Sequence, residues 1–165
     1  MVLEPHLRMM KVLILVLLGS VFLFFQFPET TDSCTIDGVQ LKLIDQGGKS
    51  VLKINNKKKE TVETLKIKPP CYFLRSEKEV QSYSYKEVNT KVIIITGAIM
   101  DKRTQEYMGA PAHMVCGTKA QGILFRNDSI IVTDTLLHGG IICKDEGLDE
   151  KDFWTLAHRK GFGRK

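Results

Sequence analysis

Two short apolar runs on either side of a polar turn constrain the fold of this chain more than any other feature of its sequence. The runs, residues 122–125 and 129–133, are rich in large and β-branched apolar residues, and Arg126-Asn127-Asp128 separates them. Short β-branched runs around an Asn-Asp turn are typical of a β-hairpin. Residues 113–116 precede the first run and are expected to form a third strand.

Much of the remaining chain also favours strands. Residues 39–44 alternate apolar and polar side chains, as a half-buried strand does, whereas residues 91–96 are almost continuously apolar, which indicates burial on both faces. Other runs predict strands at residues 50–54, 62–67, 72–74 and 80–85. Short polar turns join residues 39–44, 50–54 and 62–67 into a predicted β-meander that Pro69-Pro70 ends.

One helix is predicted, over residues 149–161. Asp149 is a suitable N-cap, and Phe153, Trp154 and Leu156 form an apolar face at helical spacing, with Trp154 expected to anchor it to the sheet. The polar residues 101–109 are predicted to form a loop. The chain is therefore expected to be mostly β, with a small antiparallel sheet or partial β-barrel, a C-terminal helix and stabilising disulfides.

The N-terminal segment predicts export. Residues 12–25 are apolar or small, Arg8 and Lys11 precede them, and polar residues follow, as in a secretory signal. Cleavage is expected near Thr31-Asp32-Ser33; the alternative is an uncleaved signal anchor, which would make the chain a single-pass type II membrane protein. At 165 residues, the chain divides into a leader or anchor over residues 1–33 and one extracellular β-rich domain over residues 34–165.

Four cysteines follow this leader: Cys34, Cys71, Cys116 and Cys143. An even number in an exported chain implies two disulfides, for which the sequence allows three connectivities. Sequential pairing, Cys34–Cys71 and Cys116–Cys143, is favoured because it closes the shortest loops. Zinc sites favour closely spaced Cys-x-x-Cys pairs, and none is present, so no metal site is predicted.

Surface chemistry provides two further candidate sites. Asn127-Asp-Ser129 is an N-glycosylation sequon within the predicted hairpin turn. Lys53, Lys57, Lys58 and Lys59 lie along the predicted meander, either as a solvated outer face or as a patch for an anionic polysaccharide or lipid surface. The formal net charge of +5 is mild and comes with no nucleic-acid motif, so no nucleic-acid partner is expected.

No arrangement of residues in the sequence predicts catalysis. His138 is the most site-like histidine and Asp134 lies near it, but no serine nucleophile motif accompanies them. The sequence also contains no phosphate-binding loop and no dinucleotide fingerprint. We therefore expect a non-catalytic chain that needs no cofactor.

Residues 111–138 resemble the opening hairpin of the chymotrypsin-like serine proteases. The matching positions are Pro111, Val115, Cys116-Gly117, residues 122–125 and residues 131–133. Where that family carries its catalytic histidine and the next cysteine, this chain reads Asp134-Thr-Leu-Leu137. The resemblance implies an inactive, partial homologue with a trypsin-like half-barrel. It also implies a disulfide from Cys116, with Cys143 substituting for the family's partner cysteine.

A second resemblance is to the large motif of animal sialyltransferases, over Lys86-Glu-Val-Asn89, Gly97-Ala98 and Met108-Gly109. The nucleotide-binding Gly-Asn pair of that family is replaced by Phe73-Leu74-Arg75, and its later histidine motif is absent. This resemblance implies an inactive, Golgi-anchored remnant.

Three functional hypotheses follow. The first is a secreted, non-catalytic serine protease homologue that binds or regulates protein partners in an extracellular cascade, for example in immunity or seminal fluid. The second is the inactive glycosyltransferase remnant. The third is a basic β-module that binds anionic surfaces through its lysines.

Overall fold

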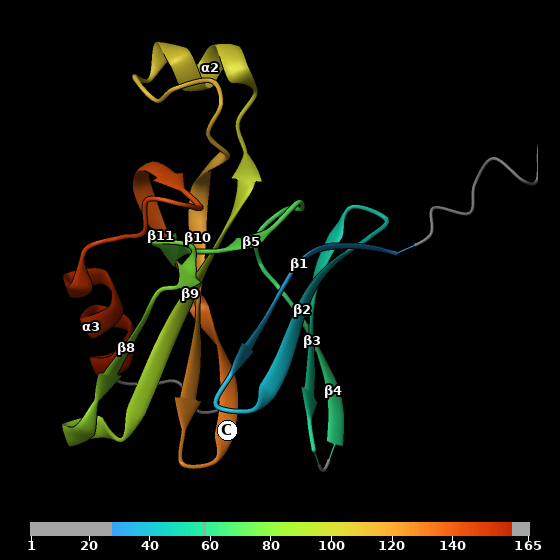
Figure 1. Ribbon diagram of the computed structural model, residues 1–165, viewed down its shortest axis with the longest axis vertical. Helices are drawn as coiled ribbons and strands as arrows, with labels where there is room; N and C mark the ends of the chain where they lie inside the picture. Colours follow the sequence, from blue (N-terminus) through green and yellow to red (C-terminus); the bar gives the residue numbers. More distant parts are fainter. Residues whose placement is uncertain (1–27, 58, 160–165) are drawn as a thin grey trace, which may run out of the picture.

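The computed structural model describes residues 28–57 and 59–159, and Figure 1 shows their arrangement. The predicted leader at residues 12–25 lies outside the described residues. No helix in the described ranges is long and apolar enough to cross a bilayer.

The first sheet is an antiparallel meander of four strands in chain order. These are β1 (Glu29–Ile36), β2 (Val39–Gln46), β3 (Lys49–Asn56) and β4 (Lys59–Thr64). Two-residue turns join β1 to β2 and β2 to β3, and Asp37 and Gly38 of the first turn both have positive φ, which matches the twist of the paired strands. The predicted meander is confirmed, although β4 ends at Thr64, before Leu65 and Ile67 enter the core.

The second sheet is antiparallel and has the order β11-β10-β9-β5, with β8 also paired to β9. Its long members are β9 (Thr90–Ile99), β10 (Cys116–Arg126) and β11 (Ser129–Cys143), and its short ones are β5 (Tyr72–Phe73) and β8 (Ser82–Tyr85). A small separate hairpin pairs β6 (Arg75–Ser76) with β7 (Glu79–Val80), and the 3-10 helix η2 (Lys86–Val88) joins β8 to β9. The hairpin predicted around Asn127 is confirmed as β10–β11, which is longer than expected.

The second sheet is the middle layer of the molecule. On one face, Ile93, Ile95 and Ile123 pack against Leu41, Leu43, Leu52 and Ile54 of the first sheet. On the other face, Val92, Ile94 and Leu124 pack against the helix α3 (Glu150–His158), as Figure 1 shows. The continuous apolar run predicted at residues 91–96 is therefore buried on both faces, because it lies between two layers.

Within the described residues, neither sheet closes on itself, so the mostly β, antiparallel prediction is confirmed and no closed barrel is present. Helix α3 begins after Asp149, whose side chain accepts a hydrogen bond from Lys151 N at 2.8 Å. The prediction that Trp154 anchors this helix is wrong, because its side chain is 51% exposed. Phe153, Leu156 and Ala157 are buried against the sheet instead.

Two predictions fail in the connection between β9 and β10, which extends as an arm at the top of Figure 1. Residues 101–109 are not a loop throughout, because Asp101 caps a short helix, α2 (Lys102–Tyr107), by accepting from Thr104 N at 3.0 Å. The strand predicted at residues 113–116 begins only at Cys116. Before it, the buried Gln105 side chain donates to the carbonyls of Pro111 and Met114, which holds this segment in a turn.

Candidate functional site

A groove of about 1020 Å³ lies where turns of both sheets come together. Figure 1 shows these turns at the lower end of the molecule. Turns from both sheets surround it: β1–β2, β3–β4, the η2 connection between β8 and β9, and β10–β11. Its apolar wall includes Val39, Phe125 and Ile130, and its rim is polar. A rigid sandwich that presents several turns around one hollow is a common scaffold for binding.

The β10–β11 turn is fixed by backbone conformation and by one side-chain bond. Asn127 and Asp128 both have positive φ, 48° and 60°, as a type I′ two-residue turn requires. Asn89, which also has positive φ, donates from Nδ2 to Asn127 Oδ1 at 2.8 Å. Asn127 is exposed on the rim of the groove, so a glycan on this predicted sequon would be attached there.

Four cations and two carboxylates line the groove, which gives it a net charge of +2. Lys91 Nζ lies 2.6 Å from both carboxylate oxygens of Asp37. Arg126 is held by neutral partners, with Nε donating to Thr90 Oγ1 at 2.6 Å and a terminal nitrogen donating to the Ala157 carbonyl. Lys57 and Lys86 are exposed and make no ion pair with any other described residue.

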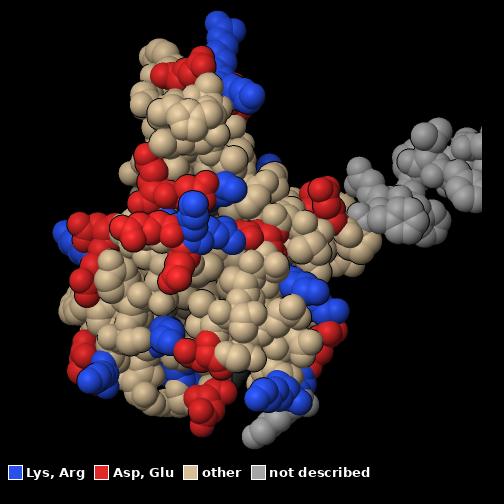
Figure 2. Space-filling view, viewed as in Figure 1, with Lys and Arg blue, Asp and Glu red and all other residues tan. Residues whose placement is uncertain are grey.

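The predicted lysine patch does not form one surface. Lys57 lies in the groove, whereas Lys53 points from the outer face of the first sheet and pairs with Glu60 at 3.0 Å. A hollow of about 70 Å³ beside Lys53 is too small for more than a few water molecules. Lys59 is exposed at the start of β4, and Lys58 lies outside the described residues. Figure 2 shows charges of both signs interspersed over the visible face.

The four cysteines divide into one disulfide and two thiols. Cys116 and Cys143 face each other on β10 and β11 and form the predicted disulfide. The predicted Cys34–Cys71 disulfide is absent, and both residues are free. Thr31, rather than Cys34, lies beside Cys71, since its Oγ1 donates to the Cys71 carbonyl at 2.7 Å. Cys34 lies three residues further along β1 than Thr31.

Burial raises the pKa of both free thiols. It raises the pKa of Cys34 to about 12, with the nearby Asp32 carboxylate adding to the effect. It also raises the pKa of Cys71 to about 11, although a contact between Cys71 Sγ and Ser50 Oγ at 3.1 Å acts against this. Cys71 is buried in the core between the two sheets, and Cys34 is partly buried against it.

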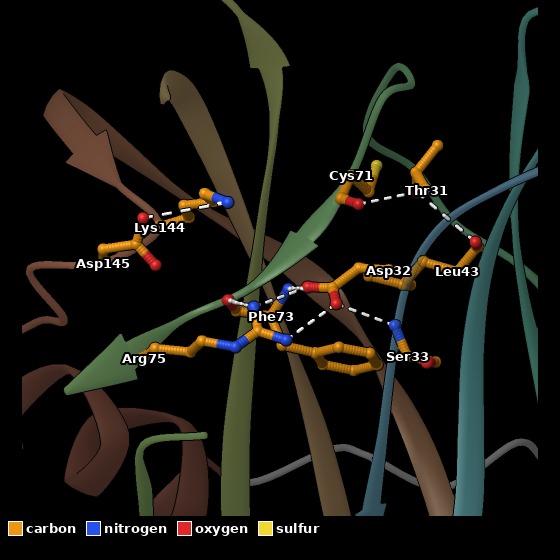
Figure 3. Close-up of polar contacts among 9 residues, drawn as sticks. All are labelled: Thr31, Asp32, Ser33, Leu43, Cys71, Phe73, Arg75, Lys144 and Asp145. Atoms are coloured by element: carbon orange, nitrogen blue, oxygen red, sulfur yellow. Dashed lines mark hydrogen bonds and ion pairs between the residues drawn. The ribbon is translucent and has the colours of Figure 1, made fainter. Parts of the chain in front are cut away.

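A second polar cluster joins the two sheets (Figure 3). Asp32 on β1 accepts two hydrogen bonds of 2.7 Å from the guanidinium of Arg75 and one of 3.0 Å from Phe73 N. These bonds raise the pKa of Arg75. The side chains of Asp32 and Arg75 are only 12% and 19% exposed. This cluster has little room for a ligand, and it fixes the edge strand β1 to the β5–β6 segment.

The residues considered for catalysis have different neighbours in the structure. Asp134 pairs with Lys66 at 2.9 Å, and His138 is exposed on β11 opposite Lys119. His113 is exposed in the connection before β10. The described ranges contain no group of three His, Cys, Asp or Glu side chains that could hold a metal ion.

Sequence reasoning found only Asn127 and Lys57 among the groove residues. Lys86, Lys91 and Arg126 were missed because they come from η2, β9 and β10, and only the pairing of β8, β9 and β10 brings them together. Left-handed turn residues, such as the Asp37-Gly38 and Asn127-Asp128 pairs, were the one signal that could have marked the turns.

Comparisons with protein-family models, with curated proteins and with solved structures found no match for this chain.

Proposed function

We propose that the chain is an exported, non-catalytic binding protein that recognises its partner through the groove between the two sheets. The groove itself carries this proposal: it is a hollow of about 1020 Å³, and turns on a rigid sandwich surround it. The signal-like segment at residues 12–25 and the disulfide Cys116–Cys143 support an exported chain.

The experiment blocks the groove and compares the proteins that are captured. Ser84 is exposed and lines the groove, so Ser84→Trp places a large side chain inside it, whereas Ser76→Trp adds the same bulk on the exposed β6 strand outside it. The full chain and both variants are immobilised and exposed to extracellular fluid from the source organism. We expect wild type and Ser76→Trp to retain the same partners and Ser84→Trp to lose them.

Two outcomes would contradict this proposal. One is an unchanged partner set on Ser84→Trp that still unfolds at the wild-type temperature. The other is turnover of peptide or glycoside substrates by the purified chain that disappears in His138→Ala. That result would indicate an enzyme whose chemistry includes β11.

The second candidate narrows the first to an inactive, partial serine protease homologue that acts in an extracellular cascade and keeps part of a trypsin-like half-barrel. The observation that favours it is the hairpin β10–β11 with a disulfide from Cys116, which is where the resemblance places one. A Golgi-anchored sialyltransferase-like remnant is the third candidate. It predicts retention of residues 12–25 in the mature chain.

A further inference from the structure

We propose that the ligand of the groove is an acidic oligosaccharide whose sulfate or carboxylate groups are bound by Lys57, Lys86, Lys91 and Arg126. This inference rests on the proposed function of the groove as the binding site. It adds the chemical class of the ligand, which the shape of the groove does not fix by itself.

The charge of the groove favours an anion. Lys57 and Lys86 come from opposite sheets, are exposed, and have no acidic partner among the described residues. Their positive charges are therefore available to a ligand. Asp37 is already paired with Lys91, so among the described residues an incoming anion meets one carboxylate without an ion pair, Asp128, against two such ammonium groups. The net attraction is electrostatic and should weaken with salt.

Two of the four cations are held in place before a ligand arrives. Asp37 fixes Lys91 Nζ through two contacts of 2.6 Å, and Thr90 fixes Arg126 Nε at 2.6 Å. Arg126 retains its full charge, because both of its partners are neutral. A guanidinium with fixed orientation suits the planar carboxylate and the sulfate of an acidic sugar, and its fixation reduces the entropy lost on binding.

Neutral polar side chains beside the cations suit a saccharide. The rim carries the exposed hydroxyls of Ser84 and Ser129 and the amide of Asn89, which already donates one hydrogen bond to Asn127. These groups both donate and accept hydrogen bonds, as sugar hydroxyls require. The volume of about 1020 Å³ lies at the upper end of the roughly 300–1,000 Å³ typical of ligand pockets, so several sugar rings fit.

The test titrates the full chain with a heparin hexasaccharide and with the same hexasaccharide after desulfation and carboxyl reduction. Calorimetry at low and at physiological salt should show binding of the acidic form only, weakening as salt rises. Lys57→Ala/Lys86→Ala should lose about tenfold in affinity, since two exposed charge contacts are removed. Lys57→Arg/Lys86→Arg should restore it, and Lys49→Ala/Lys102→Ala, with the same loss of charge away from the groove, should stay within twofold.

Three results would overturn the inference. The first is equal affinity for the neutral hexasaccharide, which would rule out charge as the basis of recognition. If Ser84→Trp abolishes that binding, the groove is still the binding site. The second is equal affinity for a poly-glutamate peptide of the same charge, which would assign the cations to acidic peptides. The third is unchanged binding of the acidic hexasaccharide to both Ser84→Trp and Lys57→Ala/Lys86→Ala. The proposed function is tested separately, by partner capture on Ser84→Trp.

Discussion

Asp32 is the residue that fixes the edge of the first sheet to the second. Its carboxylate accepts from the Arg75 guanidinium, from Phe73 N and from Ser33 N, all within 3.0 Å. Because the pair is mostly buried, removing one partner leaves the other charge without compensation. The contact therefore matters more for stability than a pair of the same chemistry on the surface.

We expect Asp32→Asn to lower the free energy of unfolding by about 2 kcal/mol, the value for a buried pair reduced for its remaining exposure. Urea denaturation gives this value directly. The matched control is Asp134→Asn, since the Asp134 side chain is 87% exposed and its oxygen is 2.9 Å from Lys66 Nζ; its loss should cost under about 0.5 kcal/mol. Equal effects of the two variants would show that Asp32 is no more than a surface charge.

The free thiols provide a second prediction at this scale. Because Cys71 is buried, Cys34 is partly buried and the pKa values of both are raised, iodoacetamide should label the native chain far more slowly than the denatured chain. In denaturant without reductant, intact mass should show two labels, and after reduction four. No labels in denaturant would mean that a Cys34–Cys71 disulfide exists after all.

At the scale of elements, glycines set the spacing of the second sheet. A Cβ on Gly117 of β10 would lie 2.2 Å from the Gly97 carbonyl oxygen on β9, so the strands would have to separate. A Cβ on Gly122 would meet Leu156 Cδ1 at 2.8 Å and Thr133 Cγ2 at 3.0 Å, which are side-chain atoms that can move. The same substitution should therefore differ in cost along one strand.

Thermal or urea unfolding should rank the two variants. We expect Gly117→Ala to cost about 3 kcal/mol and Gly122→Ala about 1 kcal/mol, because backbone yields less readily than a side chain. The reverse order would mean that β9 and β10 can shift apart more easily than α3 can adjust on the sheet.

The strand β1 predicts where the mature chain begins. Cleavage after Ser33 would remove Thr31, which bonds Cys71, and Asp32, which pairs with Arg75. An export signal that is cleaved should therefore leave residues from Glu29 onward in the folded protein. N-terminal peptide mapping of exported protein checks this. A mature chain starting at Cys34 would contradict it, and retention of residues 12–25 would favour the anchor.

The spacing of apolar residues correctly predicted the strands in which buried and exposed side chains follow a regular pattern. Residues 39–44 alternate and residues 91–96 are continuously apolar, and both became strands with the expected burial. The helix α2 was missed because its stability depends on one cap, Asp101, and on the bonds of Gln105 to a distant turn. The prediction for Trp154 was wrong because Phe153 and Trp154 are adjacent, and helical spacing alone does not say which of the two rings packs against the sheet.

At the scale of the whole molecule, the packing of the two sheets against each other depends on contacts between distant parts of the sequence, which no local pattern encodes. The groove and the separation of Cys34 from Cys71 both follow from how the first sheet lies on the second. Shortest-loop reasoning pairs cysteines by distance along the chain, but β1 places Thr31 at the position that the second disulfide would need. The candidate site was therefore predictable only at Asn127 and Lys57.

Stability should fall as the solution becomes alkaline. Burial raises the pKa of Cys34 from 9.0 to about 12, of Cys71 from 9.0 to about 11 and of Tyr85 from 10.0 to about 12. Between pH 9 and pH 12 the unfolded chain releases these protons while the folded chain keeps them, so unfolding becomes progressively more favourable. Urea midpoints between pH 8 and pH 10.5 should decrease, and less steeply in Cys34→Ala. A flat profile would mean that these groups titrate freely in the folded protein.

The order of pairing in the first sheet bears on how the molecule is made. Every strand from β1 to β4 pairs only with its neighbours in the chain, so a nascent polypeptide can complete this sheet while β9 and β10 are still unsynthesised. Its leucine-rich inner face is then exposed to solvent until the later strands arrive. The interval between the fourth strand and the ninth is thus the period in which a chaperone has most to protect.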